Sequence, residues 1–231
     1  EAVLDAACAL ELIHAATLVL DDLPSMDDAA QRRGRETTHR VYGEAPAILA
    51  SIALLVHAFD LVARNAGPLR LPREPFARVI HETAVTTGTF GLVGGQFRDL
   101  EIAGGPADFR TLEYVHSHKT GQLFVLAAVL APLLLGAAED DVEALRGYAK
   151  NLGLAYQVTD DLLDRDATAA ETGKDAGKDT ARTTFASLLS PGDAERLVLE
   201  LVDTARGALR PFGKRARLLD AFAAALPGRR R

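Results

Sequence analysis

Residues 140–164 read DDVEALRGYAKNLGLAYQVTDDLLD, and this stretch decides the fold class. Its apolar residues recur at three- and four-residue steps, as one face of an α-helix requires. The same periodicity runs through five other ranges, which are residues 4–18, about 45–63, 76–100, 112–135 and 193–209. Alternating runs bounded by hairpin turns are absent from the sequence. The sequence therefore predicts an all-α fold, built as a single bundle of long helices.

Short breaks separate these ranges, and no linker, repeat or low-complexity segment divides the chain. One domain over residues 1–231 is expected. The breaks contain Pro24, Gly34, Gly67, Pro68, Gly104, Gly105, Pro106, Gly136, Pro191 and Gly192. Glycines also interrupt the range 76–100, at Gly91, Gly94 and Gly95. Because each glycine weakens a helix by about 1 kcal/mol, we expect close packing there.

Composition excludes several classes of protein. The 231 residues are 48% apolar and carry a net charge of −6, which argues against a general nucleic-acid binder. The single cysteine, Cys8, cannot form an intramolecular disulfide, and it lies in an apolar helical range where core packing is expected. A reducing, cytoplasmic location follows as an expectation. The longest apolar run, residues 123–138, contains Pro132 and is shorter than a membrane span of about 20 residues, so stable membrane insertion is not expected.

The helix in residues 4–18 leads into an acidic stretch, Leu20 to Asp28, that reads LDDLPSMDD. Four carboxylates within eight residues repel one another unless a cation lies among them. A solvated acidic loop is the usual explanation of such a cluster. Here the apolar flank TLVL, residues 17–20, favours aspartates that emerge from a buried helix into a cavity. The basic run Arg32, Arg33, Gly34, Arg35 follows directly.

A second acidic motif ends the opening stretch. Asp160 and Asp164 are four residues apart and share a helix face, with Gln157 one turn earlier. Like charges at that spacing destabilise a helix unless a hard cation is bound. Carboxylates suit Mg²⁺, which commonly bridges to substrate phosphates. Since basic residues follow both motifs, among them Lys174 and Lys178, the two motifs together predict a metal-bridged diphosphate site.

At these residues the sequence resembles the trans-isoprenyl diphosphate synthases, the polyprenyl synthetase family. The first motif is similar to that family's longer aspartate-rich motif, and the second to its Asp-Asp-x-x-Asp form. Three further segments match the family in order, across residues 5 to 190 as a whole: Gly94–Leu100 (GGQFRDL), His118–Gly121 (HKTG) and Thr172–Asp175 (TGKD). The resemblance implies the isoprenoid synthase fold, helices around a central cavity, and a homodimer as the assembly. Residues 123–135 are a candidate interface, and buried core is an equal interpretation of that helix.

The resemblance also implies a role for each matching residue. Magnesium would be held by Asp21, Asp22, Asp27, Asp160, Asp161 and Asp164. The diphosphate of an allylic substrate would be bound by Arg32, Lys119 and Lys174, with Thr120 and Gln157 nearby. Isopentenyl diphosphate would face Arg33 and His14, although a histidine on such a helix is more often a satisfied core residue. The allylic C–O bond would then ionise, and isopentenyl diphosphate would attack the carbocation.

Two departures from the family pattern stand out. The family's upstream Gly-Gly-Lys-Arg segment has no counterpart here; since residue 1 is Glu and the first methionine is Met26, we expect residues upstream to be missing. Where many members have a lysine after the second motif, this chain has Arg182, which keeps the charge.

Product length depends, in this family, on the residues four and five positions before the first aspartate. They are Thr17 and Ala16, which are small and leave room for geranylgeranyl diphosphate (C20), as in bacterial enzymes of the carotenoid pathway. Ala16 as simple helix filler is the alternative interpretation, and a farnesyl (C15) product the alternative outcome. A class I terpene cyclase is disfavoured because the second motif is all aspartate. A non-catalytic partner subunit is disfavoured because both motifs are intact.

Overall fold

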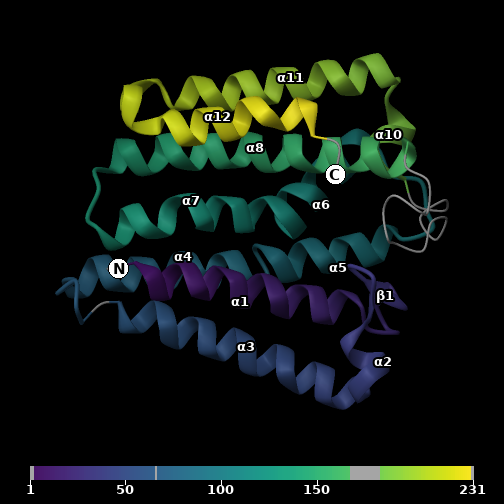
Figure 1. Ribbon diagram of the computed structural model, residues 1–231, viewed down its shortest axis with the longest axis horizontal. Coiled ribbons are helices and arrows are strands. Elements are labelled where there is room, and N and C mark those ends of the chain that lie inside the picture. Colours follow the sequence, from purple (N-terminus) through teal and green to yellow (C-terminus); the bar gives the residue numbers. More distant parts are fainter. Residues whose placement is uncertain (1–2, 66, 167–182, 230–231) are drawn as a thin grey trace. The chain divides into compact units, whose positions relative to one another are not determined.

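The computed structural model describes residues 3–65, 67–166 and 183–229 (Figure 1). The predicted all-α class is confirmed, because these residues form helices with only one very short pair of strands. They group into two compact units, and the chain passes from the first to the second between Thr83 and Ala84. The two units are described separately, and the prediction of a single domain stays a prediction.

The first unit contains α1 (Leu4–Asp21), α2 (Thr38–Tyr42), α3 (Glu44–Arg64) and most of α4 (Arg73–Thr87). Helix α1 packs along α3 (Figure 1). The buried residues of α1 are Ala6, Ala9, Ile13 and Ala16, whereas Leu4 and Cys8 are exposed. The expectation that Cys8 packs in the core is therefore wrong. Apolar residues surround α1 on most sides, so its sequence pattern does not determine which face is buried.

A β-hairpin, which the sequence did not predict, follows α1. Strands β1 (Gln31–Arg32) and β2 (Arg35–Glu36) pair antiparallel, with Arg32 opposite Arg35. The two residues between them, Arg33 and Gly34, have φ angles of 53° and 74°. Positive φ at both positions is the signature of a tight type I′ turn. Strands of two residues are too short to produce an alternating pattern, which is why periodicity missed them.

The second unit is built around α8 (Glu139–Asp166), which packs against α7 (Gln122–Leu134) and α11 (Pro191–Ala208) (Figure 1). Helices α5 (Leu92–Ile102) and α6 (Phe109–His116) pack against a π-helical turn, η1 (Ser117–Gly121), that leads into α7. The unit also contains α10 (Phe185–Leu188), the 3₁₀ segments η3 (Arg210–Ala216) and η4 (Leu226–Gly228), and α12 (Arg217–Ala225).

Two predicted helical ranges are each divided in the structure. Residues 76–100 form α4 and α5, separated by the glycine-containing segment 88–91. Residues 112–135 form α6, η1 and α7, because one turn in their middle widens to π-helix. Such turns are frequent at functional sites, since the extra residue re-aims the side chains beside it.

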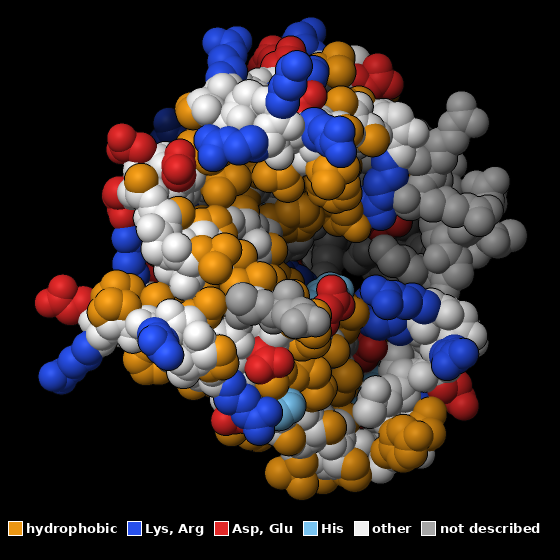
Figure 2. Space-filling model, turned by 60° about the vertical axis from the view of Figure 1, so that its left-hand side comes forward, with side chains coloured by type: hydrophobic (Ala, Val, Ile, Leu, Met, Phe, Trp, Pro, Cys, Tyr) orange, Lys and Arg blue, Asp and Glu red, His pale blue; other side chains and the backbone are white. Residues whose placement is uncertain are grey.

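Helices α7 and α3 differ in how much apolar surface they expose. The buried side chains of α7 are Val125, Leu126, Val129, Leu130, Leu133 and Leu134. These side chains belong to the core, and an interface role for residues 123–135 stays a prediction. By contrast, α3 exposes several large apolar side chains, Ile48, Leu49, Ile52 and Val56. By length and composition, α3 is the one helix among the described residues that could cross a membrane. Hydrophobic side chains, coloured orange, cover much of the face that Figure 2 shows.

Candidate functional site

The first aspartate motif begins where α1 ends. Asp22 follows the last residue of α1 and is 3% exposed. Its carboxylate accepts hydrogen bonds from Arg32, whose Nε lies 2.9 Å from both oxygens and whose Nη2 lies 2.7 Å from Oδ1. This contact ties the end of α1 to β1. The hydrogen bond to Asp22 also raises the pKa of the Arg32 guanidinium.

The loop after Asp22 folds back on the helix. The Asp27 amide donates to the Asp21 carbonyl at 2.9 Å, and the Met26 and Asp28 amides both donate to the Leu23 carbonyl. These turns bring the backbone of Asp27 next to that of Asp21, although five residues separate them in sequence. The structure thus brings together the first and third aspartates that the sequence predicted as metal ligands.

His14 and Arg33 lie within electrostatic range of each other in this unit. Burial is the main cause that lowers the pKa of the His14 imidazole, and the positive charges of Arg33 and Arg32 lower it further, against an opposing effect of Glu11. His14 is therefore neutral at neutral pH. Its backbone carbonyl accepts a hydrogen bond from Thr17 Oγ1 at 2.8 Å.

The two predicted chain-length residues differ in burial. Ala16 has no exposed surface, and Thr17 is half-buried. Both belong to α1, which packs along α3.

The second aspartate motif lies on α8, and its middle aspartate is held by protein donors. Asp161 Oδ1 accepts from Gln157 Nε2 and Oδ2 accepts from the Phe185 amide, each at 2.9 Å. Gln157 Oε1 in turn accepts from Thr120 Oγ1 at 3.3 Å. A chain of hydrogen bonds thus joins η1, α8 and α10. Burial raises the pKa of the Asp161 carboxyl to about 6, against the opposing effect of these hydrogen bonds.

The outer aspartates of this motif have different surroundings. Asp160 is half-buried and Asp164 is exposed. Arg229 Nη1 lies 3.5 Å from Asp160 Oδ1, and its guanidinium carbon lies 4.3 Å from the centre of the Tyr156 ring. The positively charged Arg229 guanidinium therefore lies beside Asp160, and cation–π attraction to Tyr156 helps to hold it there.

Lys119, on the π-helical turn, forms an ion pair with Asp99 of α5. Gly95, one turn before Asp99, faces the same turn, and a Cβ at Gly95 would clash with the backbone of His118 and Lys119. On the other side, a Cβ at Gly153 of α8 would approach the Gly121 Cα to 3.1 Å. Glycines thus let both helices approach η1 closely, and the expectation of close packing is confirmed at Gly95.

The predicted residues divide between the two units. His14, Ala16, Thr17, Arg32, Arg33 and the first motif belong to one unit, and Lys119, Thr120, Gln157 and the second motif to the other. Lys174, Lys178 and Arg182 lie outside the described residues. Hydrogen bonds join Arg32 to Asp22 in the first unit. In the second unit they join Thr120 through Gln157 to Asp161, whereas Lys119 pairs with Asp99.

Sequence reasoning assigned no role to Asp99 or His116. His116 ends α6, packs its ring 5.3 Å from the centre of the Phe185 ring, and has no hydrogen-bond partner at Nδ1. Burial lowers the pKa of the His116 imidazole to about 4, with Asp99 opposing this and Lys119 adding to it. Asp99 lies within the GGQFRDL segment, residues 94–100. The resemblance of this segment to the family was therefore the signal that could have identified Asp99 as a site residue.

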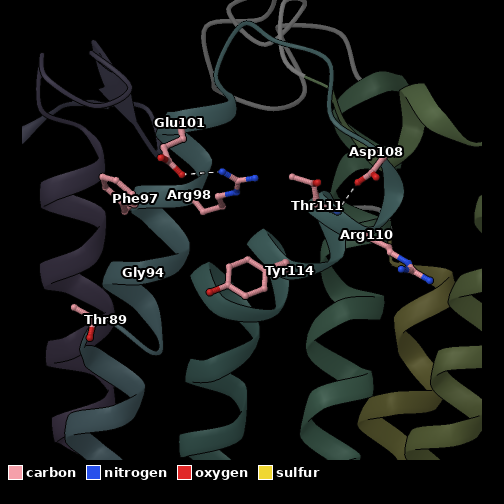
Figure 3. A pocket seen from close by; sticks show the side chains of 9 residues that line it. All are labelled: Thr89, Gly94, Phe97, Arg98, Glu101, Asp108, Arg110, Thr111 and Tyr114. Carbon is pink, nitrogen blue, oxygen red and sulfur yellow. Dashed lines mark hydrogen bonds and ion pairs between the residues drawn. The ribbon is translucent and has the colours of Figure 1, made fainter.

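A shallow pocket of about 540 Å³ lies elsewhere in the second unit, between α5 and α6 (Figure 3). Arg98 bridges to Glu101 at 2.8 Å, and Asp108 caps α6 by accepting from the Thr111 amide at 2.8 Å. Phe97 and Tyr114 complete much of its wall. None of the predicted site residues lines this pocket.

A comparison with known protein families identifies the family to which this chain belongs. The family profile for polyprenyl synthetase matches residues 1–190. The chain belongs to this family. The match covers both aspartate motifs, the Lys119 turn and the α5 segment that packs on it, as the sequence resemblance implied.

Individual relatives agree with this assignment. The chain is 40% identical to a geranylgeranyl diphosphate synthase of Cyanophora paradoxa over 96% of its own length and 75% of that protein. It is 41% identical to a dimethylallyltranstransferase of Fischerella ambigua over 94% of the chain and 63% of that protein. The chain spans about half to three quarters of the length of the curated relatives it matches.

Solved structures give the same picture. An FPP/GFPP synthase from Zymomonas mobilis, in its apo form, aligns with a TM-score of 0.85 at 32% identity, over 98% of this chain and 76% of that one. A geranyltransferase from Helicobacter pylori, complexed with magnesium and isoprenyl diphosphate, aligns with a TM-score of 0.83 at 28% identity, over 97% and 73%.

The carboxylates of the two aspartate motifs fit Mg²⁺ as a ligand set. No group of three or more Asp, Glu, His or Cys side chains that could hold a metal ion occurs among the residues that the structure describes. Mg²⁺ does not require such a cage, because it is usually bound through one or two carboxylates, several waters and substrate phosphates. Asp21 with Asp27, and Asp160 with Asp164, offer carboxylate pairs of that kind.

Proposed function

We propose that this polyprenyl synthetase condenses isopentenyl diphosphate with an allylic diphosphate and elongates the chain head to tail. The observation that carries the proposal is that each unit combines a complete aspartate motif with cationic side chains. Arg32, which is paired with Asp22, and Arg33 belong to one unit, and Lys119 belongs to the other. The family match and relatives named for this reaction support it.

Each residue has a role in binding or ionisation. Lys119 and Thr120 bind the allylic diphosphate, and the hydrogen bond to Gln157 holds the Thr120 hydroxyl in place. Arg33 and a neutral His14 bind the diphosphate of isopentenyl diphosphate. Arg32 adds positive charge beside the first motif while it stays attached to Asp22.

The aspartates would hold Mg²⁺, which neutralises the departing diphosphate so that the allylic C–O bond can ionise. The double bond of isopentenyl diphosphate then attacks the allylic carbocation, and a proton is lost to the released diphosphate. No side-chain nucleophile is required. Water must be excluded from the reacting centre, because it would otherwise quench the carbocation.

The proposed product is geranylgeranyl diphosphate. Ala16 and Thr17 are the residues that support C20 over C15, because neither side chain is large enough to close an elongation cavity early. The named geranylgeranyl diphosphate synthase of Cyanophora paradoxa supports the same product.

We also propose that the protein acts as a homodimer. The supporting observation is the exposed apolar face of α3, which includes Leu49, Ile52 and Val56 at helical spacing. A second copy of the chain is an occupant that would remove this surface from water. Sedimentation equilibrium tests the proposal, since Leu49→Glu combined with Val56→Glu is expected to yield monomers.

Alanine substitutions in both motifs test the proposed reaction. Asp21→Ala and Asp160→Ala are expected to reduce turnover by at least about a hundredfold, while the helical circular dichroism stays unchanged. Asp28→Asn is the matched control, because Asp28 is an exposed carboxylate of the same loop and asparagine tolerates its positive φ. Unaltered turnover in the alanine variants would sink the metal assignment.

A further inference from the structure

We infer that Thr37 and His39 are positioning residues, which fix the β1–β2 hairpin so that Arg33 meets isopentenyl diphosphate in one geometry. The inference rests on the proposed function, in which Arg33 binds that diphosphate. All three residues belong to the first unit, and the hairpin connects α1 to α2 there (Figure 1). Neither Thr37 nor His39 is part of an aspartate motif or of the basic run before them.

Arg33 lies at the tip of the hairpin, in a conformation that arginine rarely adopts. Its φ angle is 53° and its side chain is exposed. A residue other than glycine is strained at positive φ, so the surrounding structure has to hold it there. On one side of the tip, the contact between Arg32 and Asp22 holds β1. On the other side, the residues that follow β2 hold the hairpin.

Thr37 closes the base of the hairpin with both its backbone and its side chain. Its amide donates to the Ala30 carbonyl at 3.2 Å, and its hydroxyl donates to the Ala29 carbonyl at 2.7 Å. A threonine at the N-cap of a helix usually accepts a hydrogen bond from an amide of the first turn. Thr37 is the N-cap of α2, yet its side chain makes no such bond. The hydroxyl therefore serves the hairpin and not α2.

His39 fixes the direction of that hydroxyl. Its Nδ1 lies 3.1 Å from Thr37 Oγ1, and both residues are buried. The hydroxyl has a single hydrogen, which it donates to the Ala29 carbonyl, so Nδ1 is the donor to Oγ1. His39 is itself held on α2, because its carbonyl accepts from the Gly43 amide at 2.9 Å. Since α2 packs against α3, two buried side chains link the hairpin to a long helix.

The same contacts reach the end of α1. The Ala29 amide donates to the Asp22 carbonyl at 3.2 Å, so the residue that Thr37 holds is also tied to the first motif. Both ends of the hairpin are thus anchored beside Asp22, one through the Arg32 side chain and the other through Thr37. Arg33 lies between these anchors, and His39 controls its position without being its neighbour in sequence.

Paired variants test the inference: T37V with T37S, and H39L with H39N. Serine keeps the hydroxyl that valine lacks, and the asparagine amide nitrogen can donate from the position of Nδ1, which leucine cannot. We expect T37V and H39L to raise KM for isopentenyl diphosphate by about tenfold, and T37S and H39N to stay within about threefold of wild type. The kcat and the KM for the allylic diphosphate should change by less than about twofold, because ground-state binding alone is weakened. T38V is the matched control, as Thr38 is the neighbouring threonine on α2.

Amide hydrogen exchange supplies a readout that needs no substrate. The amides of residues 31–36 are expected to exchange at least about tenfold faster in T37V than in the wild type, while those of α1 stay unchanged. The ¹⁵N signals of wild-type His39 should show a proton on Nδ1, since the hydrogen bond to Thr37 selects that form. This measurement decides the case even if a variant does not fold.

The outcomes separate the inference from the proposed function. An unchanged KM for isopentenyl diphosphate in T37V and H39L would overturn the inference, as would a proton on Nε2 alone in wild-type His39. Equal rises in the KM of both substrates would overturn it too, because they would indicate a general loosening. Wild-type protein that does not bind isopentenyl diphosphate would instead contradict the proposed function, and the exchange rates would still decide whether Thr37 holds the hairpin.

Discussion

The Lys119 ammonium lies 2.7 Å from Asp99 Oδ2, and the two side chains are only 20% and 15% exposed. Asp99 stands one helical turn after Gly95, the residue at which α5 meets the backbone of Lys119. One face of α5 thus provides both the close contact and the counter-charge that fix this lysine. A partly buried pair of this kind is screened far less by salt than a surface pair.

Loss of the Asp99 carboxylate should loosen Lys119 without removing it. We expect Asp99→Asn to raise KM for the allylic diphosphate by about tenfold, equivalent to about 1.4 kcal/mol, because Lys119 is no longer held in one geometry. Steady-state kinetics at saturating isopentenyl diphosphate measure the change.

A double-mutant cycle controls this prediction. If Asp99 acts through Lys119, adding Asp99→Asn to Lys119→Gln should cause little further loss. Additive losses in the double variant would show that Asp99 contributes independently of Lys119.

Gly95 should tolerate no side chain. Gly95→Ala places a Cβ against the backbone of Lys119, which cannot move aside as a flexible side chain would. We expect a loss of about 3 kcal/mol in the free energy of unfolding, measured by urea denaturation. Gly207→Ala is the matched control, because nothing lies within 4 Å of that position and alanine favours helix. Equal effects at the two glycines would contradict the packing argument.

His116 should make the protein acid-labile. Its imidazole pKa is about 4 in the folded protein and 6.5 ordinarily, so the unfolded chain binds the extra proton first. The stabilisation from the neutral imidazole is complete above pH 6.5 and is lost as pH falls toward 4, by up to about 3 kcal/mol. The stability difference between wild type and His116→Phe is expected to change by about that amount between pH 7 and 4. Parallel pH profiles would refute it.

Thr17 offers the cleaner test of product length, because Ala16 is fully buried and a larger residue there would disturb the packing. Thr17→Phe is expected to shift the main product from C20 to C15, since an aromatic ring fills the space that the last isoprene unit needs. Thr17→Val, which keeps the size, should leave the product unchanged. Chromatography measures the chain length of the product that each variant makes. A C20 product from Thr17→Phe would contradict the proposal.

The sequence predicted the helices well because their apolar spacing is an averaged signal over many residues. The 76–100 and 112–135 ranges show its limit, since a few residues at 88–91 and the π-helical turn interrupt the helix while the spacing continues. The hairpin at Arg32 to Arg35 was missed for the same reason. The burial of Cys8 was misjudged because α1 is apolar on most sides, so that its sequence pattern does not show which face is buried; Cys8 is exposed.

Residue types could be predicted at the site, but their partners could not. Sequence placed Asp22 and Asp161 among the predicted metal ligands, since carboxylates in one motif look alike. Only the folded structure distinguishes a carboxylate that accepts from Arg32 or the Phe185 amide. Likewise, nothing in the sequence paired Lys119 with Asp99, because that ion pair depends on how closely Gly95 lets two helices approach.

The proposed chemistry is tested most directly by product formation from defined substrates. Purified protein is supplied with isopentenyl diphosphate, Mg²⁺ and each of the C5, C10 and C15 allylic diphosphates in turn, and product lengths are read by chromatography. Geranylgeranyl diphosphate that forms with Mg²⁺ and disappears on chelation is the predicted result. A C15 end point would keep the prenyltransferase and discard the argument from Ala16 and Thr17. No elongated product from any starter would contradict the account.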